Sequence, residues 1–319
     1  MNSYINKDSN WIEPYAVHHL SVGQGHTLYV EECGNARGLP IVFLHGGPGS
    51  HCKPHHRALF DPQIYRIILF DQRGAGRSTP TGSLEHNTTQ ELLADMEQLR
   101  TYLGIQNWVV CGGSWGATLG LLYAQQHYEH TLGLVLRSIF LARERDIHWS
   151  YRDGGVNRLF PKQWKAFVRF LPTHEHWDNP LGVYYNLLTG NDLSLAKQAA
   201  LAWSAWGGCM VNYGQFEVPT ECTQEILNEA RIECHYMFHH CFIHENQLLQ
   251  NVEKVADIPT ILLHGQRDLV APLESSYFLE QPWPAAQLRV LPNCGHLTSE
   301  PEMMAALIEA TNDIAKILS

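Results

Sequence analysis

The stretch Trp108-Val109-Val110-Cys111-Gly112-Gly113-Ser114-Trp115-Gly116 decides how this sequence folds. Its first three residues are apolar and predict a buried strand, and a helix-forming run, 117–126, follows the last glycine. Between strand and helix, Gly-x-Ser-x-Gly places a serine in a tight glycine turn, which is the context that a nucleophile elbow requires. The glycines avoid side-chain clashes beside the strained backbone of Ser114. The stretch therefore predicts an exposed nucleophilic serine on an α/β sheet.

Apolar runs on both sides of this stretch extend the sheet. Short apolar segments, typical of parallel strands covered on both faces, occur at 40–44, 66–70, 132–137, 259–264 and 287–291. Residues 27–33 alternate apolar and polar side chains and predict a half-exposed edge strand. Helical spacing predicts a helix over 89–103, and a terminal helix is expected over 301–318. This alternation of strand and helix indicates a mostly parallel, doubly wound α/β sheet.

The alternation stops at Ser138 and resumes after about Asn251. The residues between are rich in tryptophan and look helical, with fewer clear strands. A helical insertion late in an α/β sheet predicts a cap. We therefore divide the chain into an α/β core domain of residues 1–138 and 252–319 and a helical cap domain of residues 139–251.

The bulk composition argues against several classes of protein. The net charge of −10 argues against nucleic acid or an anionic membrane as a partner. The eight cysteines show no CxxC spacing, which argues against a zinc knuckle or a thioredoxin-type site. Residues 1–8 lack the apolar run of a signal peptide, and no stretch approaches the roughly 18 apolar residues of a membrane span. We expect free thiols and a cytoplasmic location.

Three chemically competent residues each follow a predicted strand. Ser114 is the first, Asp268 follows the strand ending at His264, and His296 follows the last strand. Ligands of open α/β sheets bind at the carboxyl edge, so these side chains are expected to meet there. The order Ser, Asp, His is that of α/β-hydrolase triads. His296 would accept the serine proton, and Asp268 would fix the imidazole tautomer.

A glycine-rich loop, His45-Gly46-Gly47-Pro48-Gly49, follows the strand at 40–44. Small residues there would let backbone N–H groups approach a substrate closely. We expect the N–H groups of Trp115 and Gly47 to form the oxyanion hole. His45 is interpreted as a residue that fixes the loop by hydrogen bonding rather than as a catalytic base.

These motifs together resemble the proline iminopeptidase (prolyl aminopeptidase) family. The resemblance rests on His45 to Gly49, on Asp71-Gln72-Arg73-Gly74-Ala75-Gly76-Arg77-Ser78, and on Gly112 to Gly116. It continues through 87–89, His148-Trp149, Ala230-Arg231-Ile232-Glu233, 265–268 and 295–296, and so spans nearly the whole chain. It implies an α/β-hydrolase fold with an inserted helical cap domain, cleavage of an N-terminal proline from small peptides, and no metal or organic cofactor.

The resemblance also implies how the substrate is recognised. Cap carboxylates would bind the free imino group, because a protonated amine in a closed pocket needs a counter-charge, and aromatic rings would surround the pyrrolidine. Glu233 matches one such carboxylate, although Glu229 and Arg231 nearby are also compatible with a solvated helix face. The remaining substrate contacts implied are Phe140, Gly46, Trp149 and Trp206.

The sequence departs from the family pattern in the expected pocket. A second glutamate is expected after Trp206, but Gly207 stands there. A charge-assisted contact contributes about 1.5–3 kcal/mol, so its loss predicts a decrease of about tenfold or more in kcat/KM. Ser150 and Met237 also stand where the family usually has aromatic residues. We expect a pocket that is wider and less anionic than is usual in the family.

Two groups of histidines could suggest a metal site. One group comprises His235, His239, His240 and His244, and the other comprises His51, His55 and His56. Neither completes a known ligand signature, so we interpret the first as ordinary cap histidines and the second as structural or pocket-lining.

The sequence thus predicts a serine hydrolase that acts by acyl transfer on a small peptide or amino-acid-derived substrate. Its oligomeric state is left open. One rival is an esterase or amidase with another small substrate, which the changed pocket motivates. Another is a catalytically silent binding protein, against which the intact triad argues. Haloalkane and epoxide hydrolases carry an aspartate where Ser114 stands.

Overall fold

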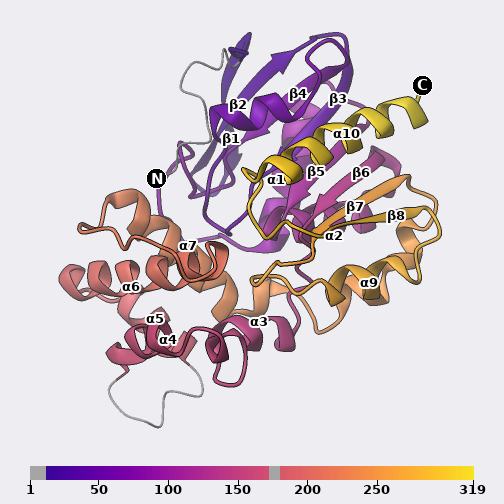
Figure 1. Ribbon diagram of the computed structural model, residues 1–319. Helices are drawn as coiled ribbons and strands as arrows, with labels where there is room; N and C mark the ends of the chain where they lie inside the picture. The colour runs from indigo at the N-terminus through magenta and orange to yellow at the C-terminus, as the bar shows by residue number, and fades with distance from the viewer. Residues whose placement is uncertain (1–11, 172–179) are drawn as a thin grey trace.

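The computed structural model describes residues 12–171 and 180–319, and within them eight strands form one sheet (Figure 1). The strand order is β1-β2-β4-β3-β5-β6-β7-β8. All neighbours from β4 to β8 pair in parallel, whereas β2 pairs antiparallel to both β1 and β4. The strands are β1 (Ala16–Gly23), β2 (His26–Gly34), β3 (Leu39–Leu44), β4 (Tyr65–Phe70), β5 (Trp108–Gly113), β6 (Thr131–Arg137), β7 (Thr260–Gly265) and β8 (Ala286–Leu291).

The prediction of an edge strand at 27–33 is wrong. These residues lie in β2, between β1 and β4, and β1 forms the edge. Alternating apolar and polar side chains indicate that only one face of a strand is covered. An interior strand at the antiparallel end of a sheet can also be covered on one face only. β1 itself was not predicted, because His18, His19 and Ser21 interrupt its apolar residues.

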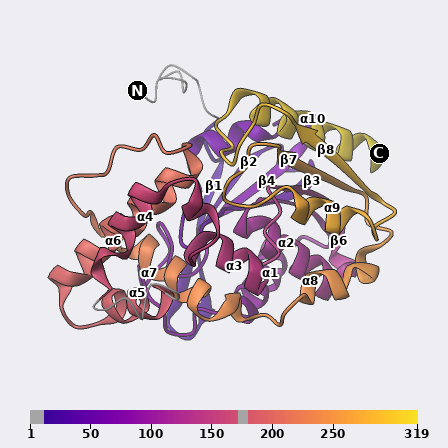
Figure 2. The same cartoon turned by 60° about the horizontal axis from the view of Figure 1, so that its bottom comes forward.

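Two apolar layers enclose the sheet because successive side chains of a strand point to opposite faces. On β3 and β5, Val42 and Val110 join the layer with α1 (Thr89–Tyr102), α2 (Trp115–Gln126) and α9 (Glu274–Glu280). Ile41 and Val109 join the opposite layer with α10 (Pro301–Ile317). Figure 2 shows α10 above the strands and α1 and α2 below them. The predicted doubly wound α/β architecture is confirmed.

The segment between β6 and β7 is helical, and α4 to α7 gather beside the sheet (Figure 1). Its helices are α3 (Glu144–Tyr151), α4 (Pro161–Phe167), α5 (Pro180–Thr189), α6 (Leu193–Val211), α7 (Gln224–Phe238) and α8 (Gln247–Gln250). Asp192 and Thr223 begin α6 and α7 as N-caps, each accepting a hydrogen bond from the backbone N–H three residues on. We refer to 139–251 as the cap, whose status as a separate domain stays a prediction.

Other sequence expectations can be compared with the described residues. The eight cysteines, all at described positions, are free. No described helix has both the length and the apolar character needed to cross a bilayer. Residues 1–8, on which the expectation about a signal peptide rests, lie outside the described residues.

Candidate active site

Ser114 occupies the sharp turn between β5 and α2. Its φ of 57° and ψ of −123° are strained for a residue with a side chain. A Cβ at Gly112 would collide with the carbonyl of Gly116, and a Cβ at Gly116 would collide with the carbonyl of Leu44. Both glycines are therefore required by close backbone packing, and the strand–turn–helix context predicted for this motif is present.

His296 and Asp268 are in direct contact. The His296 Nδ1 lies 2.8 and 2.9 Å from the two Asp268 carboxylate oxygens. The backbone N–H groups of Val270 and Ala271 also donate to Asp268, each at 2.9 Å. Burial opposes ionisation of Asp268, but the charge and hydrogen bond of His296 outweigh it and lower its pKa to about 2. Asp268 is thus an ionised acceptor that holds the imidazole.

Two charged side chains hold the loop that carries His296. The Arg137 guanidinium, at the end of β6, donates to the His296 carbonyl oxygen. The Glu300 carboxylate accepts from the Gly295 N–H at 2.9 Å and from the Leu297 N–H at 3.3 Å. Sequence reasoning missed both residues, although each adjoins a predicted strand end or the Gly295-His296 motif.

One cavity of about 590 Å³ brings the predicted residues together. Ser114 and His296 both line it, and Asp268 lies behind His296. The three residues follow β5, β7 and β8, whose carboxyl ends share one sheet edge. The arrangement can support nucleophilic acyl transfer.

The glycine-rich loop after β3 forms another part of the cavity wall. Gly46 and Gly47 line the cavity, and Gly47 has a φ of 110°, which favours glycine. The His45 Nε2 accepts from the Gln72 N–H at 2.9 Å, and the Gln72 side chain donates to the His45 carbonyl at 2.9 Å. Burial lowers the pKa of His45 to about 4. These hydrogen bonds agree with the interpretation of His45 as a residue that fixes the loop.

Gln72 also links this loop to the nucleophile turn. Its side-chain oxygen accepts from the Trp115 indole at 2.9 Å while its amide nitrogen donates to His45. The rest of the motif 71–78 is ionic. Arg77 pairs with Asp71 at 2.7 Å and Arg73 with Asp95 at 2.6 Å. The motif 71–78 therefore stabilises the loop of residues 45–49 and the turn that carries Ser114.

Glu233 lies on α7 and lines the cavity opposite the sheet edge. The Trp203 indole donates to one carboxylate oxygen at 2.7 Å, and the Tyr151 hydroxyl donates to the other at 3.2 Å. Burial, reinforced by the nearby charge of Glu229, raises the pKa of Glu233 to about 7. The carboxylate is therefore available to a cation that enters the cavity.

Three of the five predicted substrate-contact residues lie on the cavity wall, namely Glu233, Phe140 and Gly46. The other two lie elsewhere. The Trp149 indole donates to the carbonyl of Leu269, and the buried Trp206 donates to the carbonyl of Ser150. Their rings pack inside the cap or against the core, so the expectation of substrate contact does not fit their positions. Trp203 and Tyr151 supply the aromatic wall instead.

The cavity wall also carries a carboxylate that was not predicted to line it. Glu229 lines the same cavity as Glu233, one helical turn earlier on α7. In the sequence, Glu229 stands out only as a charged neighbour of Glu233 that is compatible with a solvated helix face. Helical spacing could have found it, because the α7 residues on the cavity wall are 226, 229, 230, 233 and 237. Gly207, Ser150 and Met237 do lie on this wall, as expected.

Most of the histidines singled out in the sequence have ordinary surroundings. His51, His55 and His56 line the cavity, in keeping with their interpretation as pocket residues. In the cap, the His235 Nε2 lies 3.0 Å from the carbonyl of Asn87.

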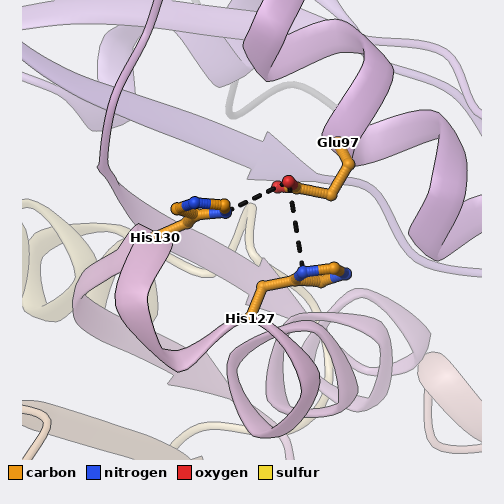
Figure 3. A group of neighbouring side chains, drawn as sticks. All are labelled: Glu97, His127 and His130. Carbon is orange, nitrogen blue, oxygen red and sulfur yellow. Dashed lines mark ion pairs between the residues drawn. The ribbon is translucent and has the colours of Figure 1, made fainter.

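One group of side chains elsewhere has the composition of a metal site (Figure 3). Glu97 on α1 lies 3.1 Å from the Nδ1 of His130 and 4.0 Å from that of His127. The Arg100 guanidinium already donates to both Glu97 oxygens at 2.8 Å, and the Tyr123 hydroxyl donates to one of them at 2.5 Å. Burial opposes ionisation, but these donors lower the pKa of Glu97 to about 2. The network accounts for the group without an ion, and we assign no metal to it.

Comparison with known proteins finds similarity to α/β-hydrolases and, among them, to proline iminopeptidases. Residues 40–302 match the family described as alpha/beta hydrolase fold. A proline iminopeptidase of Xylella fastidiosa (strain 9a5c) is 44% identical over 305 residues, which cover 94% of this chain and 97% of that protein. One of Arabidopsis thaliana is 40% identical, covering 99% and 84%. The solved proline iminopeptidase of Mycobacterium smegmatis matches with a TM-score of 0.60 at 20% identity, covering 95% and 100%, a likeness of fold alone.

Proposed function

This chain belongs to the proline iminopeptidase family of α/β-hydrolases, and from that premise we propose how it releases the N-terminal proline of peptides. One observation carries the proposal. A single cavity holds Ser114 and His296, the Gly46–Gly47 loop, and the carboxylate of Glu233. The cavity thus combines a nucleophile, Ser114, and a base, His296, with a carboxylate that can bind a positively charged group.

In the acylation step, Ser114 Oγ attacks the carbonyl carbon of the N-terminal proline while His296 takes the hydroxyl proton. The oxygen of the tetrahedral intermediate accepts hydrogen bonds from the N–H groups of Trp115 and Gly47. His296 then gives its proton to the departing amine, and the C–N bond breaks. Asp268 remains ionised throughout and stabilises the imidazolium.

Deacylation repeats these roles with water as the nucleophile. His296 removes a proton from water, which attacks the prolyl ester of Ser114. The ester C–O bond breaks, and the proton returns to Ser114 Oγ. Free proline leaves, and the serine is regenerated.

Recognition of the free imino group falls to Glu233. The Glu233 carboxylate is half-buried and its pKa is raised, so it gains from pairing with a cation that offsets the cost of desolvating its charge. The protonated proline nitrogen supplies that cation. Substrates with a blocked N-terminus are excluded by the same logic.

A second candidate function is an esterase or amidase with another small substrate. The observation that favours it is the free space beside Gly207, where a Cβ would meet nothing within 4 Å. Ser150 and Met237 widen the same wall. A silent binding protein is a third candidate, and the Asp268–His296 contact argues against it.

A substrate panel tests these candidates. We expect prolyl-naphthylamide to be hydrolysed faster than alanyl-naphthylamide and N-acetyl-prolyl-naphthylamide not to be hydrolysed. Rapid turnover of short acyl esters with none of prolyl-naphthylamide would favour the esterase. Absence of a fluorophosphonate adduct on Ser114 in the folded protein would favour the binding protein.

We also propose a cytoplasmic location. The eight free cysteines support it, since disulfides are rare in reducing compartments. Fractionation of the source cells, with assay of prolyl-naphthylamide turnover in each fraction, tests the proposal.

A further inference from the structure

The cavity carries two carboxylates, and the second comes from a helix other than the one suggested by the family resemblance. The resemblance placed a second glutamate at position 207 on α6, where this chain has glycine. Glu229 instead lies on α7, four residues before Glu233, so both side chains fall on one helix face. Both line the cavity that contains Ser114.

The two carboxylates have no ion-pair partner in the described part of the chain. Within residues 12–171 and 180–319, no Lys, Arg or His nitrogen lies within ion-pair distance of Glu229 or Glu233. The charge of Lys53 acts on Glu229 without forming an ion pair, and the Ser50 side chain hydrogen-bonds to it. Burial and the charge of Glu225 raise the pKa of Glu229. Two adjacent half-buried carboxylates without an ion-pair partner favour a ligand that brings a cation.

The ligand group must therefore be compact and positively charged, with donors for two acceptors. A protonated secondary amine meets this requirement, because it has two N–H groups and one positive charge. Each carboxylate oxygen has two lone pairs, so Glu233 can accept from the amine while it keeps Trp203 and Tyr151 as donors. The open space beside Gly207 leaves room between α6 and α7 for the ring that carries the amine.

We propose that Glu229 is a specificity-determining residue that, together with Glu233, binds the protonated N-terminal amine of the substrate and replaces the carboxylate missing at position 207. The inference rests on the proposed prolyl aminopeptidase function. It differs from that function in assigning the second charge to α7, so that α6 contributes space rather than charge.

The first test compares Glu229→Gln with Glu225→Gln. Glu225 lies on the same helix but is exposed and outside the cavity wall, so it serves as a matched control. We expect Glu229→Gln to lower kcat/KM for prolyl-naphthylamide about tenfold or more and to leave turnover of p-nitrophenyl acetate within twofold of the wild type. Glu225→Gln should change neither rate by more than about twofold.

The two substrates separate amine recognition from a structural role. Because Glu229 also contacts Ser50, a purely structural residue would slow the neutral ester and the prolyl substrate equally. An equal loss on both, or no loss on either, would overturn the inference. A wild-type enzyme that hydrolyses the ester but not prolyl-naphthylamide would instead overturn the proposed function.

A rescue experiment tests the replacement directly. A Cβ at Gly207 would meet no heavy atom within 4 Å, so Gly207→Glu introduces no clash at the first side-chain atom. In the Glu229→Gln background, we expect Gly207→Glu to restore at least a third of the lost kcat/KM for prolyl-naphthylamide. Gly207→Gln in the same background should restore none of it. Equal rescue by both substitutions would show that bulk rather than charge matters and would contradict the proposal.

Discussion

Two walls of the same cavity shift the pKa values of their acidic side chains in opposite directions. We call the strand ends that carry Asp268 and His296 the sheet edge, and the face of α7 that carries Glu229 and Glu233 the cap wall. At the sheet edge, Asp268 accepts hydrogen bonds from two backbone N–H groups and contacts His296, and its pKa falls to about 2. On the cap wall, Glu233 has two neutral donors and a carboxylate neighbour, and its pKa rises to about 7. The first charge is satisfied by the protein, whereas the second is left for a ligand to satisfy.

We infer from this difference that the two walls serve different steps. A fully partnered charge fixes geometry and is suited to a reaction that every substrate undergoes. An unsatisfied charge distinguishes one substrate from another, because only a cation offsets its burial. Substitutions at the sheet edge should therefore affect all substrates alike, while substitutions on the cap wall should affect only those with a free amine.

The largest effect should come from removing the nucleophile. We expect Ser114→Ala to lower kcat at least about 10⁴-fold for both prolyl-naphthylamide and p-nitrophenyl acetate, because attack then relies on water alone. Steady-state kinetics with both substrates measures this, and circular dichroism checks the fold. Loss on only one substrate would break the proposed division between the walls.

Asp268→Asn should have the next largest effect, again on both substrates. The asparagine leaves the shape of the site intact but no longer fixes the tautomer of His296, and we expect kcat to fall by about 10³- to 10⁴-fold. A fall of less than tenfold would mean that another group, such as the neighbouring His264, orients the imidazole.

Glu233→Gln should separate the two substrates. We expect kcat/KM for prolyl-naphthylamide to fall about 10- to 100-fold because a charge-assisted contact is lost. Ester turnover should stay within about threefold of the wild type. Comparable losses on both substrates would place Glu233 with the sheet edge rather than with the recognition wall.

The pH dependence gives a finer measure of the same contrast. Glu233 loses its negative charge as the pH falls through about 7, so the ratio of prolyl to ester kcat/KM should fall with it, about tenfold between pH 7.5 and 6. The ratio removes the titration of the triad, which both substrates share. The substrate amine stays protonated over most of this window. In Glu233→Gln the step in the ratio near pH 7 should be lost, and any remaining dependence belongs to Glu229, whose pKa is also raised. A ratio independent of pH in the wild type would argue against Glu233 as the ionising group.

The smallest effect is expected from Gly207→Glu in the otherwise unchanged enzyme. A third carboxylate beside Glu229 and Glu233 adds repulsion as well as attraction for the amine, so we expect kcat/KM for prolyl-naphthylamide to change by no more than about threefold. A gain of tenfold or more would indicate that the wild-type pocket lacks a second effective carboxylate.

The contrast between the walls also explains what the sequence revealed. The sheet and Ser114, Asp268 and His296 were predictable because each residue adjoins a short apolar strand and a glycine turn, and the carboxyl ends of parallel strands meet at one edge. Their proximity then follows from topology alone.

The cap wall was less predictable because helix packing sets which side chains face the cavity. Trp206 and Glu229 show the two kinds of error. Trp206 adjoins the diverged position 207, but its ring stacks on that of Phe167 within the cap, with the ring centroids 5.6 Å apart. Glu229 is compatible with a solvated helix face in the sequence, but it lines the cavity. The edge strand was misjudged for a similar reason, since the polar residues of β1 hid its presence beside β2.

The contact between Gly49 and α7 has a consequence for altering this enzyme. A Cβ at Gly49 would collide with the Ile232 side chain, so the loop that precedes it rests against the helix that carries Glu229 and Glu233. A cap transplanted from a relative would therefore change the surface against which the loop of residues 45–49 packs, as well as the substrate specificity. In such chimaeras, α7 and residues 45–50 should be exchanged together.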